Sequence, residues 1–250
     1  MAGIVLNSRV RAATEGIEDN SFHFGLEAYP TGAEREDDSM KSHLASPHST
    51  SVHMIAMAQP KILWIDGVGS YAICDQNEIT IGQAFPGNAV DLAIRGDLSR
   101  RAAVIRRHGE DHLVQPLQLV QVNGSEIDRA VVLSDGSVIS LGSRIELKYN
   151  KPTQLSGSAR LELIGHTRWQ PLLSAALLMG ESCVLGPESN SHVICPDWTY
   201  KVVLFRNGAQ WMCRVNDQAN IQIDGKLVRA PFPLVQGQRI RGDEISMTLE

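Results

Sequence analysis

A serine followed by two arginines is the group in this sequence best suited to bind an anion. Ser99, Arg100 and Arg101 precede a second arginine pair, Arg106 and Arg107. A serine hydroxyl and a guanidinium both donate hydrogen bonds to phosphate, and bonds to a charged acceptor are the stronger kind. In a strand, alternation sends Arg100 and Arg106 to one face and Arg101 and Arg107 to the other. The four arginines therefore cannot share one site, and the alternative is an edge strand kept soluble by charge.

The other side chains capable of chemistry form no recognisable site. The cysteines have no metal-ligand spacing, so we expect buried thiols in a reducing compartment: Cys74, Cys183, Cys195 and Cys213. Three histidines recur at a spacing that suits no single helix face: His43, His48 and His53. There is no zinc-protease, serine-hydrolase or kinase signature. We therefore expect no metal, no cofactor and no catalytic activity.

Composition narrows the class of partner. The chain has 250 residues, of which 43% are hydrophobic and 20% charged, as in a globular protein. A net charge of −5 and an aromatic content of 5% disfavour nucleic-acid binding. No apolar run approaches the ~20 residues needed to span a bilayer, and the apolar opening is too short for a secretory segment. We expect a cytoplasmic protein with a protein partner and no nucleic acid, membrane or small-molecule cofactor.

The elements that would position Ser99 begin near Lys61. Residues 1–59 mix Ser, His, Gly and acids without an apolar period, which predicts a disordered tail. Met54 and Met57 are alternative starts of the translated chain. Short β-rich runs separated by Gly, Asn and Asp follow, and they predict strands at residues 62–65, 78–81, 111–114, 130–133, 137–141 and 144–149. Many short strands indicate a sandwich or barrel. Only residues 171–179 are ambiguous between helix and strand.

Two stretches about one hundred residues apart repeat each other. Four blocks correspond in the same order: Ile81-Gly82 with Leu185-Gly186, residues 97–106 with 197–206 without a gap, residues 122–127 with 223–228, and residues 133–139 with 234–240. Internal repetition of this kind indicates two copies of one unit. The prediction is a first domain at 60–152 and a degenerate second domain at 155–250.

The first copy resembles the forkhead-associated (FHA) domain. Four motifs follow the family's order: Ile79-Thr80-Ile81-Gly82-Gln83 for a strand ending in Gly-Arg, Ser99-Arg100-Arg101-Ala102 for a Ser-Arg-x-His turn, Val122-Asn123-Gly124 for a hydrophobic-Asn-Gly turn, and residues 133–142 for a Leu-x-Asp-Gly-Asp-x-Ile-x-Leu-Gly run. The resemblance covers residues 61–150 and, more faintly, 156–250. It implies an eleven-stranded β-sandwich that binds phosphothreonine peptides through loops at one end. The fold class is thus all-β, with two tandem FHA-like β-sandwiches after a disordered tail.

Carried over residue by residue, the phosphopeptide site is incomplete. Gln83 stands for the phosphate-facing arginine, Ala102 for the bracing histidine, and Leu117-Gln118 for the Thr-Asn pair. The resemblance therefore assigns the phosphopeptide-binding positions to Ser99, Arg100, Gln83 and Gln118. It assigns structural turn positions to Gly82, Asn123 and Gly124. In the second copy, the residues that remain at the corresponding loop are Thr199 and Lys201.

The leading hypothesis is a non-catalytic adaptor in bacterial-type cytoplasmic signalling that recognises phosphothreonine peptides. The first alternative is a pseudo-FHA scaffold that binds an unphosphorylated protein partner. A cryptic enzyme is a third class, and a cleft with perturbed titratable groups would support it.

Overall fold

The computed structural model describes residues 60–250, which fall within one compact unit. The predicted tail at 1–59, with its three histidines, lies outside the described residues. Every regular element from residue 60 onward is a strand, so the all-β prediction is confirmed. No helix in this part of the chain is long and apolar enough to cross a membrane.

The largest sheet has twelve strands. Their bounds are β1 Lys61–Ile65, β2 Gly69–Cys74, β7 Val120–Val122, β8 Ser125–Glu126, β10 Val138–Leu141, β11 Ile145–Asn150, β12 Ala159–Ile164, β14 Ala175–Leu178, β19 Gln222–Ile223, β20 Lys226–Leu227, β22 Arg239–Arg241 and β23 Ser246–Leu249. They lie in the order β20-β19-β22-β23-β1-β2-β14-β12-β11-β10-β7-β8.

Two smaller sheets complete the fold. The six-stranded sheet, in the order β13-β4-β3-β5-β6-β9, comprises β3 Glu78–Gln83, β4 Leu92–Arg95, β5 Ala103–His108, β6 Asp111–Pro116, β9 Val131–Val132 and β13 Arg168–Gln170. The five-stranded sheet, in the order β16-β15-β17-β18-β21, comprises β15 Ser182–Gly186, β16 Val193–Ile194, β17 Val202–Asn207, β18 Gln210–Val215 and β21 Phe232–Pro233.

Each smaller sheet contributes to its own hydrophobic core. The first core joins Ile81 and Ile105 of the six-stranded sheet to Leu147 of the large sheet. The second joins Leu185 and Leu204 of the five-stranded sheet to other strands of the large sheet. β11 shows the pattern that builds such a core, because its alternate residues are buried while those between them are exposed. The predicted pair of β-sandwiches is therefore present.

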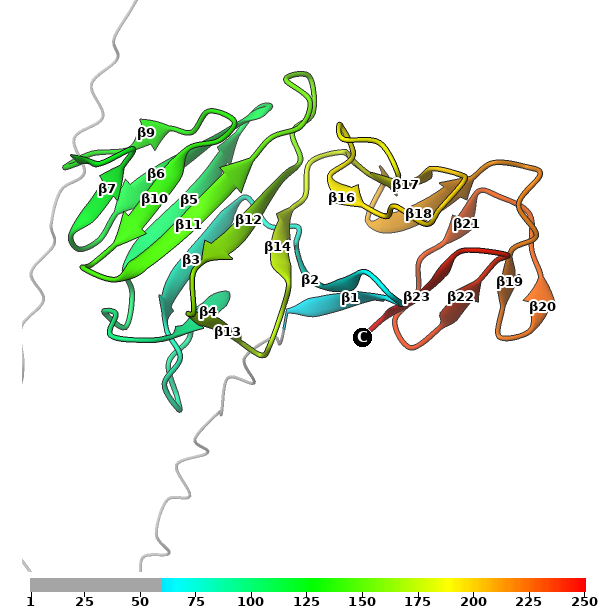
Figure 1. The fold of residues 1–250 in the computed structure, drawn as a ribbon, viewed down its shortest axis with the longest axis horizontal. Coiled ribbons are helices and arrows are strands. Elements are labelled where there is room, and N and C mark those ends of the chain that lie inside the picture. The colour runs from blue at the N-terminus through cyan, green and yellow to red at the C-terminus, as the bar shows by residue number, and fades with distance from the viewer. Residues whose placement is uncertain (1–59) are drawn as a thin grey trace, which may run out of the picture. The chain divides into compact units, whose positions relative to one another are not determined.

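The two sandwiches exchange strands. β1 belongs to the second core through Leu63 and Ile65, and it pairs with β23, so the first strand lies beside the last (Figure 1). β12, which follows β11 in sequence, contributes Leu161 to the first core and pairs with β11. The second sandwich thus uses β1, and alternate residues of β2, together with strands from β15 onward. The sequence division near residue 153 does not coincide with the division of the cores.

β2 and β14 lie between the two cores as a parallel pair. Ala176 and Leu178 of β14 contact the first core, and Ala175 and Leu177 contact the second. Because both faces are buried, this strand has a continuous apolar run instead of alternation, which explains why residues 171–179 were ambiguous in sequence. The structure shows that the middle of this segment is a strand, β14.

The structure also corrects the alignment of the two copies by one residue. Ile81 pairs with Ala103, and its counterpart Leu185 pairs with Val202, whereas the gapless alignment matches Ala103 to Val203. The loop that follows Thr199 is therefore one residue shorter than the loop that follows Ser99. A slip of one residue exchanges the faces of a strand, so the gapless match would have turned core side chains to solvent.

Candidate functional site

The loop that carries Ser99 crosses directly over β3. A Cβ atom at Gly82 would lie 1.9 Å from the Arg100 carbonyl oxygen, so only glycine permits this crossing. The Gln83 backbone N–H donates to the Ser99 carbonyl at 3.0 Å. Gly82 therefore has a packing role beneath the loop and does not itself face a ligand.

Asn88 fixes the same loop from the other side. Its side-chain amide donates to the carbonyl oxygens of Gln83 and Arg100, at 2.8 and 2.7 Å. One amide thus ties the end of β3 to the Ser99 loop. The sequence analysis did not identify Asn88. The loop that contains Asn88 differs in length from the corresponding loop of the second copy, so the repeat gives no signal there.

Ser99 and Gln118 meet at a pocket of about 220 Å³ at the loop end of the first sandwich. The lining residues come from three loops: Asp97, Leu98, Ser99, Ala102, Gln118, Leu119, Gly142 and Ser143. Backbone bonds hold the rim, since Leu117 and Gln118 both donate to the Ala102 carbonyl and Gly142 donates to that of Leu119. Leu119 is 49% exposed at this rim. We call this pocket and its rim the first loop end.

Ser99 has donors available at the first loop end. Its backbone N–H and its hydroxyl have no hydrogen-bond partner among residues 60–250. The side chains of two other predicted binding residues, Gln83 and Arg100, make their contacts outside the pocket. The Gln83 amide donates to the Gly96 carbonyl at 3.1 Å, and the Arg100 guanidinium lies 5.3 Å above the Phe85 ring. The one ionisable residue in the pocket lining is Asp97.

The arginines singled out in the sequence do not form one cluster. Arg106 pairs with Glu78 at 3.0 Å, and Arg107 donates to the Asn77 side chain at 2.8 Å. Both lie on β5, away from the Ser99 loop, so strand pairing separates them from Arg100. Their partners identify them as surface residues of the six-stranded sheet.

The corresponding loop end of the second sandwich is occupied from within. Glu244 accepts hydrogen bonds from the Thr199 backbone N–H and, at 2.8 Å, from its hydroxyl. Lys201 pairs with Glu188 at 2.6 Å. A smaller pocket of about 170 Å³ lies here, and Thr199, Asp243 and Glu244 are among its lining residues. Both predicted residues of the second copy are thus engaged by acids of the same chain, Thr199 through hydrogen bonds and Lys201 through an ion pair.

Asn123 and Gly124 lie in the turn from β7 to β8 and do not line the pocket. Asn123 has φ 52°, and its side chain accepts from the Val138 N–H at 2.9 Å. Asp224 has φ 50° and accepts from the Arg239 N–H at 3.4 Å. The two copies therefore use one turn with Asn in the first and Asp in the second, residues that tolerate the left-handed region.

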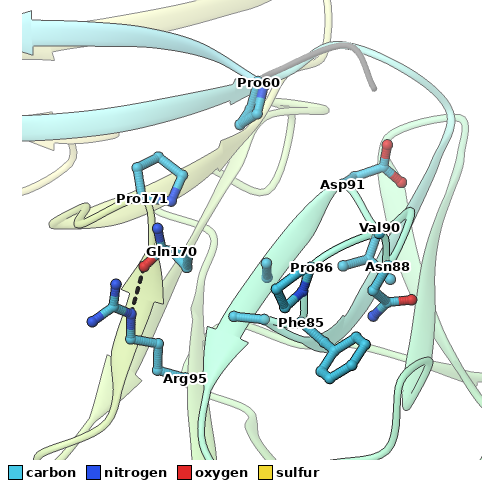
Figure 2. Close-up of a pocket in the computed structure, with 12 residues that line it drawn as sticks. Pro60, Phe85, Pro86, Asn88, Val90, Asp91, Arg95, Gln170 and Pro171 are labelled. Carbon is cyan, nitrogen blue, oxygen red and sulfur yellow. Dashed lines mark hydrogen bonds between the residues drawn. The ribbon is translucent and has the colours of Figure 1, made fainter. Parts of the chain in front are cut away.

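A larger groove of about 630 Å³ lies beside β4, under the loop from residue 84 to residue 91. Figure 2 shows Phe85 and Pro86 on one side and Arg95, bonded to Gln170, on the other. None of the predicted site residues lines it. Phe85 connects this groove to the first loop end, because the same ring supports Arg100.

One serine–histidine pair has the spacing of a nucleophile and its base. The Ser156 hydroxyl lies 3.0 Å from His192 Nε2, while His192 Nδ1 accepts from the Val184 N–H. Nε2 therefore carries the proton and donates to Ser156, whose oxygen also accepts from the Ser158 N–H. The histidine does not act as a base toward this serine, and burial lowers its pKa. The pair joins the segment after β11 to the second sandwich.

The cysteines and acidic groups offer no alternative chemistry. All four cysteines are buried and unpaired, and burial raises the pKa of Cys183 and Cys213 to about 12. Such thiols stay protonated and unreactive at neutral pH. Among residues 60–250, no three His, Cys, Asp or Glu side chains gather to hold a metal ion.

Comparisons with known proteins add a structural match. The sequence matches no protein-family model, and no curated protein matches it. A solved structure, described as the N-terminal FHA domain from EssC, a component of the bacterial Type VII secretion apparatus, matches 76% of this chain and 92% of its own length. The identity is 10% and the TM-score 0.23. A TM-score this low does not bear on function, and the all-β architecture rests on the strands themselves.

Proposed function

We propose that the protein is a non-catalytic interaction module and that the first loop end binds a segment of a partner protein. The observation that carries this proposal is a preformed pocket in which Ser99 keeps two free donors beside a half-exposed leucine. Such a combination of apolar rim and unpaired donors suits a peptide segment. Backbone hydrogen bonds already fix the rim of the pocket, so binding costs little additional conformational entropy.

Between the two classes of ligand raised by the sequence, the geometry favours an unphosphorylated segment. A phosphothreonine dianion calls for at least one cation aimed at it. Arg100 lies on Phe85, Gln83 carries no charge, and the acid Asp97 lines the pocket. The phosphothreonine hypothesis keeps only the Ser99 donors in its favour.

Fluorescence polarisation of the full chain tests both classes. The probes are fluorescein-labelled degenerate peptide libraries with either threonine or phosphothreonine at the fixed centre. We expect binding without preference for phosphothreonine, and a loss of about tenfold or more in Ser99→Ala, because one hydrogen bond to a charged or polar acceptor disappears. Ser125→Ala, at an exposed position of β8, is the matched control. Binding restricted to the phosphorylated library would restore the original hypothesis, and binding equal in Ser99→Ala and the native chain would contradict the proposed site.

A further inference from the structure

The second loop end shows which group the donors of the first are built to receive. Glu244 places one carboxylate oxygen on the Thr199 N–H and the other on its hydroxyl. Ser99 occupies the corresponding place in the first copy and presents the same two donors. A carboxylate with two oxygens matches these two donors one for one.

Glu244, which fills the site in the second copy, has a counterpart of opposite charge in the first copy. Counted back from an isoleucine that is buried in its own core in both copies, Arg144-Ile145 corresponds to Glu244-Ile245. The turn before this isoleucine is one residue shorter in the second copy, since Ser140 pairs with Glu146 and Arg241 pairs with Ser246. Arg144 therefore stands where Glu244 stands in the second copy. A guanidinium cannot accept hydrogen bonds, so Arg144 cannot take the place of Glu244 on the Ser99 donors.

The charges near the first loop end do not exclude an anion. Arg144 is exposed and follows Ser143, which lines the pocket, while Asp97 is the one ionisable residue in the lining. Asp97 does not prevent carboxylate binding, because Asp197 holds the same place in the second copy, one residue before the buried Trp198, and Glu244 still bonds Thr199 there.

We infer that the first loop end takes an aspartate or glutamate side chain of the partner, held by the N–H and hydroxyl of Ser99 and attracted by Arg144. This inference rests on the proposed function and names the chemistry that the partner must supply. The partner carboxylate completes in the first copy the bonding that Glu244 completes in the second. A single negative charge suffices, since only two donors are presented.

Amide NMR of the full chain tests the inference without knowledge of the partner. The probes are acetyl-glutamate methylamide, its uncharged isostere acetyl-glutamine methylamide, and acetyl-phosphothreonine methylamide. The expected result is a saturable shift of the Ser99 amide with the glutamate compound and an affinity lower by at least about tenfold with the glutamine compound, because bonds to a charged acceptor are the stronger. The Thr199 amide should not respond.

Two variants that exchange the residue types at positions 144 and 244 test whether the response depends on these residues. Arg144→Glu should let the first copy fill its own site, with loss of the glutamate response and a melting temperature that does not fall. Glu244→Arg should open the second site, so that the Thr199 amide now responds. No shift at Ser99, an equal response to glutamate and glutamine, or a response to phosphothreonine alone would each overturn the inference.

The outcomes separate this inference from the proposed function. If peptide-library binding is lost in Ser99→Ala but glutamate and glutamine bind equally, the first loop end is the interaction site and its ligand is not a carboxylate. If the glutamate compound shifts Ser99 while library binding is unchanged in Ser99→Ala, the carboxylate site stands and the proposed peptide surface lies elsewhere.

Discussion

At the second loop end, the donors of Thr199 are taken by Glu244, whereas at the first loop end the donors of Ser99 face an open pocket. The surrounding frame is similar, since Asn123 and Asp224 make equivalent turns and a glycine lies beneath each loop, although the loop that follows Thr199 is one residue shorter. The comparison teaches that a carboxylate from the same chain fills the second site, whereas the counterpart of that residue in the first copy, Arg144, carries no acceptor for the Ser99 donors.

The largest expected effect tests whether the two sandwiches can exist apart. Fragments 60–152 and 155–250, expressed singly, should both lack a cooperative unfolding transition, because each has lost strands that complete its core. The loss exceeds the 5–15 kcal/mol by which an ordinary domain is stable. Circular dichroism during thermal unfolding measures this, with 60–250 as the control.

Co-expression of the two fragments should recover a folded complex on size-exclusion chromatography, because the exchanged strands would then find their places. A cooperative transition in isolated 155–250 would show that the strand exchange is not needed for stability.

Acid should weaken the first sandwich through His112. Burial lowers the pKa of His112 to about 4, and its ring contacts the Tyr149 hydroxyl at 3.0 Å. Between about pH 6.5 and 4 the unfolded chain binds the proton and the folded chain does not, so stability falls as the pH falls through this window. The expected loss is on the order of 2–3 kcal/mol. In the second sandwich Trp211 holds the equivalent place and does not titrate.

Urea unfolding at pH 7 and pH 4 measures this dependence. His112→Phe should remove most of it while lowering stability at pH 7, because Tyr149 loses its partner. His166→Gln, at an exposed loop position, is the control. His192, whose pKa burial also lowers, should leave a smaller residual slope of the same sign. An unchanged slope in His112→Phe would exclude His112 as the source.

The two glycines beneath the loops should respond differently to the same change. In Gly82→Ala, the new Cβ meets the Arg100 carbonyl at 1.9 Å, so the backbone must move, at a cost of about 1–3 kcal/mol. In Gly186→Ala, the nearest atom is the flexible Lys201 Cγ at 3.0 Å, and the cost should stay below about 1 kcal/mol. Urea unfolding of both variants compares them, and equal losses would refute the difference in loop approach.

The smallest expected effect concerns the Glu244 bonds themselves. Glu244→Gln weakens an exposed, charge-assisted pair, so the free energy of unfolding should fall by about 0.5–1 kcal/mol. Arg144→Gln, at the corresponding position of the first copy, should change it by less than about 0.5 kcal/mol. Thermal unfolding of the two variants at matched salt gives the difference. A larger loss in Arg144→Gln would mean that Arg144 has a structural partner.

Much of the local structure followed from the sequence. The alternation in residues 144–149 predicted a strand, and β11 is found at Ile145–Asn150. For the candidate site, the sequence predicted Ser99 and Gln118, which the structure brings together. It did not predict that Gln83 and Arg100 would turn to Gly96 and Phe85, because those contacts depend on loop paths.

The sequence by itself determined the strands and the turns at Asn123 and Asp224, because these depend on side-chain periodicity and on backbone conformations set by neighbouring residues. Tertiary structure alone decided that β1 completes the second core and β12 the first, since either pairing satisfies the same alternation. It also decided that Glu244 closes the Thr199 site while Arg144 leaves the Ser99 site open. Both outcomes depend on contacts between segments that are far apart in the sequence, and no local sequence pattern encodes such contacts.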